Sequence, residues 1–263
     1  MNQLLYDVLM EIFCPKCGRN EFWKTKDNRL KCKNCRYLFT PKENIFKISN
    51  STLKEVISEF LLEHSTNIIL ERIKISKYKL LKILNILRIL ITKKVVESFN
   101  GKIKIDEKFF ENELKNALKG KKKKKEEERR RKNEIIIGIF CEKEKCYAKP
   151  LLNIKPSEVK SFLKKKEKLN LSEKWVENVG IVFKGSLFRL TPRKKGVDIL
   201  SIFWGYLKRK LSEKGGIRRE KLPFYLGEYS FRFNMRKKDL KSKEDYLLNL
   251  IFEYSKNKMI KIK

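Results

Sequence analysis

Four cysteines near the start of the chain restrict its fold more than any other feature. Cys14 and Cys17 form one CxxC pair, and Cys32 and Cys35 form a second. Two residues between thiolates let both sulfurs of a pair reach one ion, and two pairs complete a tetrahedral site. The spacing therefore predicts structural Zn²⁺ bound by these four cysteines. A redox role is disfavoured because no βαβ pattern surrounds the pairs.

Residues 1–48 are expected to form a small zinc ribbon around this site. Between the pairs, Phe22, Trp23 and Leu30 flank the turn-like Asp27-Asn28, which indicates a hairpin. A ribbon of this size is not expected to fold without its metal. The sequence alone leaves DNA recognition, RNA binding and protein docking open as its role. The remaining thiols, Cys141 and Cys146, are interpreted as core or surface thiols.

The charge of the chain favours a polyanionic partner. Its 65 Lys and Arg residues outnumber 32 Asp and Glu residues, giving a net charge of +33. Lys or Arg placed on nucleic-acid phosphates releases condensed counterions, which favours binding. A membrane is not expected as partner, because no apolar run approaches the roughly 20 residues that span a bilayer. Asp7 and Glu11 near the start argue against a signal peptide, so we expect a reducing compartment.

Residues 49–100 are predicted to be a helical module. A short helix capped by Ser65 or Thr66 precedes a tight turn at Lys74–Ser76 and a longer helix from Lys77 to about Ile91. This order resembles a helix-turn-helix whose second helix would present Lys77, Lys79 and Lys82 to DNA. A plain three-helix bundle with a solvated basic face fits the spacing equally well. His64, the only histidine, is interpreted as structural.

Residues 101–263 mix strand and helix patterns. Alternation from Lys102 to Asp106 predicts a half-buried strand that ends on acids, and residues 119–133 are a low-complexity basic stretch. That stretch is either a solvated helix held by charge pairs or a basic loop. The rest predicts an α+β or α/β domain, with strands at Ile135–Cys141, Lys145–Leu152, Val179–Phe183 and Leu187–Leu190 and helices at Ser157–Lys168, Ile199–Leu211 and Asp245–Tyr254.

The order of motifs resembles the DDE transposases of an insertion-sequence family related to the Merlin transposons. The ribbon and helices are followed by Phe99 to Glu107, which is similar to the family's "G-x-V-x-x-D-E" start of the catalytic domain. Ile202 to Lys208 resembles its "S-F-W-S-x-L-K" helix. Tyr225 to Asn234 resembles its "Y-L-x-E-F-x-x-R-x-N". The resemblance covers nearly the whole chain, and it implies an α+β multidomain protein with an RNase H-like domain at 101–263.

The resemblance also implies catalytic residues. Asp106 corresponds to the first metal-binding acid, Asp198 is the candidate third ligand, and Lys208 is the candidate downstream lysine that contacts DNA. The family places a second Asp between these acids, but this sequence has none there. Glu167 is the nearest carboxylate at suitable spacing, and Glu173 and Glu177 are weaker alternatives.

These assignments imply a DNA transposase that binds double-stranded DNA at element ends and cleaves and transfers strands with Mg²⁺ or Mn²⁺. From the resemblance we also expect a homodimer or larger assembly, in the cytoplasm and nucleoid or in the nucleus of a eukaryotic host. Two alternatives stay open. One is a catalytically impaired, transposase-derived DNA-binding protein or regulator. The other is an RNA-binding or transcription-associated zinc-ribbon protein.

Overall fold

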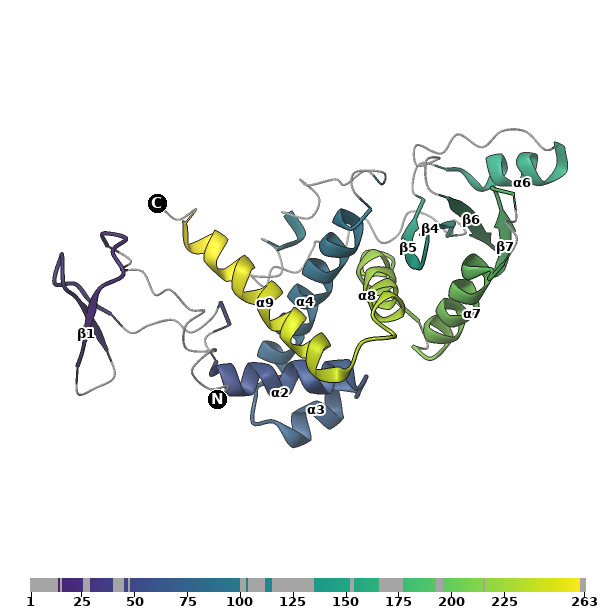
Figure 1. Ribbon diagram of the computed structural model, residues 1–263. Coiled ribbons are helices and arrows are strands. Elements are labelled where there is room, and N and C mark those ends of the chain that lie inside the picture. Colours follow the sequence, from purple (N-terminus) through teal and green to yellow (C-terminus); the bar gives the residue numbers. More distant parts are fainter. Residues whose placement is uncertain are drawn as a thin grey trace. The chain divides into compact units, whose positions relative to one another are not determined.

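The chain is an α+β protein with two antiparallel sheets, seen in a computed structural model (Figure 1). It divides into two compact units, residues 1–79 with 244–263 and residues 80–243, and each is considered by itself. The structure describes residues 14, 16–25, 29–39, 45–46, 48–99, 103, 112–114, 135–151, 154–165, 177–192, 196–214 and 216–260. Among these residues, no helix has both the length and the apolar composition needed to cross a bilayer.

The first unit contains the predicted hairpin as part of a three-stranded sheet. Its strands are β1 (Phe22–Lys24), β2 (Leu30–Cys32) and β3 (Leu38–Phe39), in the order β1-β2-β3. In β2, Leu30 and Cys32 are buried, whereas Lys31 between them is exposed. The alternation expected of a half-buried strand therefore holds over β2.

Three helices of the predicted module begin in the same unit. They are α2 (Asn50–Leu61), α3 (Thr66–Arg72) and α4 (Lys77–Glu97). The side chain of Ser49 caps α2 and that of Ser65 caps α3, each by accepting a backbone N–H. The turn between α3 and α4 lies where the sequence predicts it. α4 continues beyond Ile91 because Thr92, Val95 and Val96 extend its buried side. The last helix, α9, spans Leu240–Ile260.

The second unit is built on a four-stranded antiparallel sheet. Its strands are β4 (Ile137–Glu142), β5 (Lys145–Pro150), β6 (Asn178–Phe183) and β7 (Ser186–Arg189), in the order β5-β4-β6-β7. The strands predicted at Ile135–Cys141 and Lys145–Leu152 correspond to β4 and β5, which pair antiparallel. Helices α7 (Ile199–Ser212) and α8 (Leu222–Asn234) pack on one face of the sheet, and α6 (Pro156–Lys165) lies on the other (Figure 1).

Helix α8 is the element that the sequence patterns missed. It covers the free edge of β5 with two polar side chains. Asn234 accepts the N–H of Cys146 at 2.8 Å and donates to its carbonyl at 3.0 Å. Ser230 accepts the N–H of Ala148 at 3.1 Å. An open strand edge presents unpaired backbone groups, so these bonds complete the sheet on the β5 side.

A glycine in α8 allows α4 and α8 to approach closely. A Cβ atom on Gly227 would lie 2.0 Å from Oγ1 and 2.6 Å from Cβ of Thr92. Gly205 in α7 is exposed, and a Cβ there would meet no atom within 4 Å. Close packing against Thr92 therefore requires glycine at position 227, whereas packing does not require glycine at position 205.

We expect Gly227→Ala to lower the free energy of unfolding by about 1–3 kcal/mol, because the added methyl group overpacks the contact with Thr92. Gly205→Ala is the matched control, and it should raise stability by about 0.5–1 kcal/mol, the helix-propensity gain of alanine over glycine. Chemical denaturation of both variants checks this. Equal effects of the two substitutions would contradict the close approach.

Candidate functional site

The four predicted zinc ligands lie together. Their sulfur atoms are all within 4.8 Å of one another. Cys14 Sγ lies 3.4 Å from Cys35 Sγ, and Cys17 Sγ lies 3.5 Å from Cys32 Sγ. A tetrahedral zinc ion with Zn–S bonds of about 2.3 Å needs sulfurs about 3.8 Å apart. The cluster therefore fits one four-coordinate ion, as the spacing of the cysteines predicts.

The two CxxC turns have the same backbone geometry. The N–H of Gly18 donates to the carbonyl of Cys14 at 2.9 Å, and the N–H of Arg36 donates to that of Cys32 at 3.0 Å. Both donors have positive φ, 74° for Gly18 and 57° for Arg36. Glycine adopts this conformation readily, whereas arginine is strained in it. The sequence alone signals the turn only in the first pair.

The crowded thiols differ in acidity. A backbone hydrogen bond from Arg19 is the main cause that lowers the pKa of Cys17 to about 6. For Cys35 a backbone hydrogen bond from Tyr37 acts in the same direction, but desolvation and the three neighbouring thiols outweigh it and raise the pKa to about 12. A cation among the sulfurs favours the thiolate form of all four, so the donor set suits a divalent metal ion.

A basic surface surrounds the turn between α3 and α4. Lys77 and Lys79 are exposed, and Lys82 is half-buried. An open groove of about 390 Å³ lies beside this turn and is lined by Ser49, Lys74 and Lys79, among others. The N-terminal ends of α2 and α4 meet at the groove, and helix N-termini favour anions. The groove is therefore electropositive.

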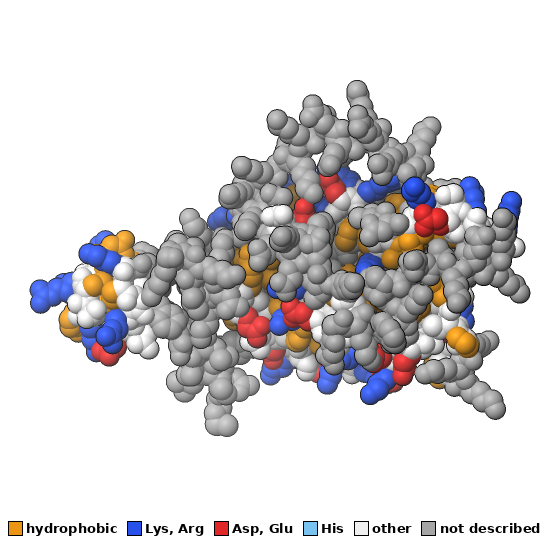
Figure 2. Space-filling view, turned by 90° about the horizontal axis from the view of Figure 1, so that it is seen from above, with side chains coloured by type: hydrophobic (Ala, Val, Ile, Leu, Met, Phe, Trp, Pro, Cys, Tyr) orange, Lys and Arg blue, Asp and Glu red, His pale blue; other side chains and the backbone are white. Residues whose placement is uncertain are grey.

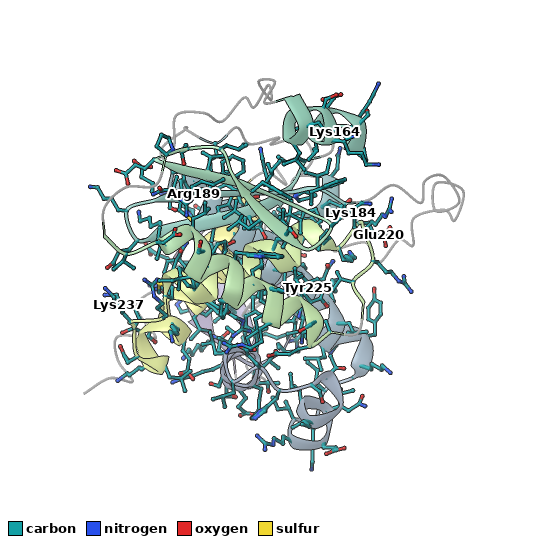
Figure 3. All side chains as sticks on the ribbon, turned by 90° about the vertical axis from the view of Figure 1, so that its right-hand side faces the viewer. Lys164, Lys184, Arg189, Glu220, Tyr225 and Lys237 are labelled. Carbon is teal, nitrogen blue, oxygen red and sulfur yellow. The ribbon has the colours of Figure 1, made fainter. Side chains whose placement is uncertain are left out.

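The predicted catalytic acids are only partly visible. Asp106 and Glu167 lie outside the described residues, as does the basic stretch 119–133. Asp198 is the N-cap of α7: it accepts the N–H of Ser201 at 3.3 Å and the Ser201 hydroxyl at 2.7 Å. It also forms an ion pair with Arg189 (labelled in Figure 3). Partial burial raises the pKa of Asp198, but the hydrogen bonds from Ser201 and Arg189 lower it to about 2.

A second helix cap repeats the contacts of Asp198 with serine. At the start of α9, Asp239 accepts the N–H of Ser242 at 3.0 Å and the Ser242 hydroxyl at 2.5 Å. Helix capping thus accounts for the Asp-x-x-Ser pattern at both places. Asp198 differs from Asp239 in its ion pair with Arg189. Within the described parts of the chain, no group of three acids, histidines or cysteines other than the cysteine cluster lies close enough to hold a metal ion.

The structure describes two further residues that the sequence analysis named as candidate site residues, Lys208 and Glu177. Lys208 is exposed on α7, next to the buried Leu207. Glu177, a weaker candidate for the second acid, is exposed and accepts the backbone N–H of Lys143 at 3.1 Å.

A buried ion network joins α4 to α8, and sequence reasoning missed it. Glu228 accepts from Arg88 Nε at 2.6 Å and from Arg232 Nε at 2.9 Å. The Arg88 guanidinium lies 4.4 Å from the ring centre of Tyr225, which is labelled in Figure 3. Burial raises the pKa of Glu228, but the two guanidinium groups outweigh it and hold the pKa below its usual range. The only local signal is the i,i+4 spacing of Glu228 and Arg232.

Comparison with known proteins gives no relative. No protein-family model, curated protein or solved structure matches the chain.

We expect the purified chain to contain one zinc ion, and Cys14→Ala to lose it because three thiolates no longer complete the tetrahedral site. Cys141→Ala is the matched control, since Cys141 is also a buried thiol but lies outside the cluster. It should retain one zinc ion per chain. Elemental analysis of the three proteins checks this, and zinc retained by Cys14→Ala would contradict the four-thiolate site.

Proposed function

We propose that the chain is a DDE-type DNA transposase that binds duplex DNA and cleaves it with a divalent metal ion. The exposed basic surface at the start of α4, beside the electropositive groove, is the observation that carries the DNA-binding part. The net charge of +33 supports the same partner. The catalytic part rests on the motif resemblance and on the acids that it identifies.

The α3–α4 geometry supports a helix-turn-helix role. In that motif two helices are joined by a turn of three or four residues, and the second helix enters the major groove with its N-terminal residues at the base edges. In this chain the first turn of α4 carries Lys77, Tyr78 and Lys79, all exposed. The groove lined by Ser49 and Lys74 would receive a backbone phosphate next to them.

In the catalytic part of the proposal, residues 101–263 form an RNase H-like domain. Asp106, Asp198 and Glu167 are the acids that would hold Mg²⁺ or Mn²⁺, which activates water and stabilises the leaving oxygen when bound. The low pKa of Asp198 keeps its carboxylate ionised at neutral pH. Lys208, exposed on α7, would contact a phosphate of the DNA strand.

The contact between Asp198 and Arg189 favours a second candidate, a DNA-binding protein derived from a transposase and without cleavage activity. Oδ1 of Asp198 is engaged by Arg189, and Oδ2 accepts the Ser201 hydroxyl. A metal ion at this carboxylate would have to compete with these donors. In this second candidate Asp198 serves as a helix cap, like Asp239.

We expect the double variant Lys77→Ala, Lys79→Ala to bind duplex DNA more weakly and with a smaller salt dependence. Each lost phosphate contact removes about 0.9 from the slope of log K against log salt, so the slope should fall by about 2. The control removes two exposed lysines from α6, Lys160 and Lys164 (Figure 3 labels Lys164). Fluorescence anisotropy at several salt concentrations gives the slopes, and equal losses in both variants would count against the α4 surface.

We expect Mg²⁺- or Mn²⁺-dependent cleavage of the DNA that flanks the gene, and we expect Asp106→Asn to abolish it. Asp198→Asn should also abolish cleavage if Asp198 is a metal ligand, whereas Asp239→Asn, which alters a similar helix cap, should leave it intact. Gel analysis of labelled DNA ends is the readout. Duplex binding without cleavage by the unaltered chain would reject the transposase and leave the second candidate.

A further inference from the structure

The three-stranded sheet of the ribbon has two chemically different faces. Cross-strand pairs lie on the same face, so Trp23, Lys31 and Leu38 form one row across the sheet. Phe22 and Cys32 form the neighbouring row on the opposite face. We call the face with Trp23 the outer face and the face with Cys32 the inner face.

The inner face supplies the packing of the ribbon. Cys32 is fully buried and Leu30 is 6% exposed. The rings of Phe22 and Phe39 meet edge to face at 5.4 Å, and Tyr37 stacks on Phe39 at 6.2 Å. Aromatic contacts of this kind stabilise small domains. The apolar side chains that hold the ribbon together therefore lie on the side of the metal cluster.

The outer face leaves a tryptophan in solvent. Trp23 is 50% exposed and Leu38, in the same row, is 39% exposed. An exposed tryptophan contributes only part of its area to folding, so packing alone does not account for it at this position. Tryptophan with an exposed ring is enriched where proteins bind partners.

Cations surround Trp23 on the outer face. Lys31 is its cross-strand partner, and residues two positions apart on a strand share a face. The ladder continues on both sides, because the N–H of Lys33 donates to the carbonyl of Glu21 and that of Thr25 donates to the carbonyl of Arg29. Arg29, Lys31 and Lys33 are all exposed. Among the described residues of the ribbon, Glu21 is the acid beside them, and its carboxylate lies 3.8 Å from Lys33 Nζ. Figure 2 shows hydrophobic side chains next to Lys and Arg on the ribbon, at the left of the view.

We propose that the outer face of the ribbon binds single-stranded DNA, with an unpaired base stacked on Trp23 and the phosphates contacting Lys31 and its neighbours. This inference rests on the proposed function and gives the ribbon a task different from that of α4. Aromatic rings beside basic side chains bind single strands without sequence preference. In a duplex the faces of the bases are covered by their neighbours, so the ring of Trp23 can stack only where a strand is unpaired.

The test compares two exposed aromatic residues on opposite faces of the same sheet in the full chain. Trp23→Ala should weaken binding of a labelled oligothymidine about tenfold, in line with the loss of one stacked base. Tyr37→Ala is the matched control, since Tyr37 is 45% exposed and lies on the inner side with Phe39. It should leave binding unchanged. Trp23→Phe should restore most of the affinity, because the smaller ring still stacks.

Zinc content is measured for each variant to show whether the ribbon has folded. If Trp23→Ala does not fold, Trp23→Phe and Lys31→Ala are compared with the unaltered chain in its place. The latter should reduce the salt slope for the single strand by about 0.7. Equal losses for Trp23→Ala and Tyr37→Ala, or none, would overturn the stacking surface. Tighter binding of an oligouridine with the same dependence on Trp23 would overturn the assignment to DNA.

A duplex of the same length separates this inference from the proposed function. Trp23→Ala should bind the duplex as the unaltered chain does, whereas Lys77→Ala, Lys79→Ala should lose duplex affinity. If the duplex is bound and oligothymidine is not, only the inference about the outer face fails. If neither is bound, the proposed function fails with it.

Discussion

The carboxylate of Glu228 is buried between the guanidinium groups of Arg88 and Arg232, and this pairing fixes how the second unit is assembled. A buried charge that loses its partner costs about 3–5 kcal/mol, so α4 and α8 cannot separate without a large penalty. Gly227 lies in the same helix and permits the close contact with Thr92. Other side chains of α8 form hydrogen bonds with the backbone at the edge of β5. Within the second unit, one helix thereby connects α4 to the four-stranded sheet.

The elements that local patterns predict well are those whose causes are local. The CxxC pairs, the serine cap of α3, the hairpin of β1 and β2 and the strands of the four-stranded sheet follow from spacing, capping and hydrophobic patterning. α8 was missed because Pro223 and Gly227 weaken the helical pattern, although proline is tolerated in the first turn of a helix. The contacts that stabilise α8 involve residues distant in sequence: Glu228 forms an ion pair with Arg88, 140 residues away. No local pattern contains such a partner.

The candidate sites divide in the same way. The four-cysteine cluster could be predicted completely, since four cysteines at two short spacings determine their own geometry. Asp198 could be named as a candidate ligand only through the resemblance. Its contact with Ser201 follows the i,i+3 spacing of a helix cap, whereas its ion pair with Arg189 was not predictable from spacing. The motif from Tyr225 to Asn234 also has a structural explanation here. Its Glu bonds to α4, its Asn bonds to β5 and its Arg supports the Glu within α8, so folding constraints alone can account for these three residues of the motif.

The side-chain bonds from Ser230 and Asn234 to β5 bear on how the protein can be handled. A fragment that ends before α8 would leave the N–H groups of Cys146 and Ala148 unpaired at the edge of β5. Such edges recruit strands from other chains and lead to aggregation. Truncation at the loop after α7 would therefore yield inclusion bodies rather than a smaller soluble domain, and any expression boundary in this half of the chain belongs after Asn234.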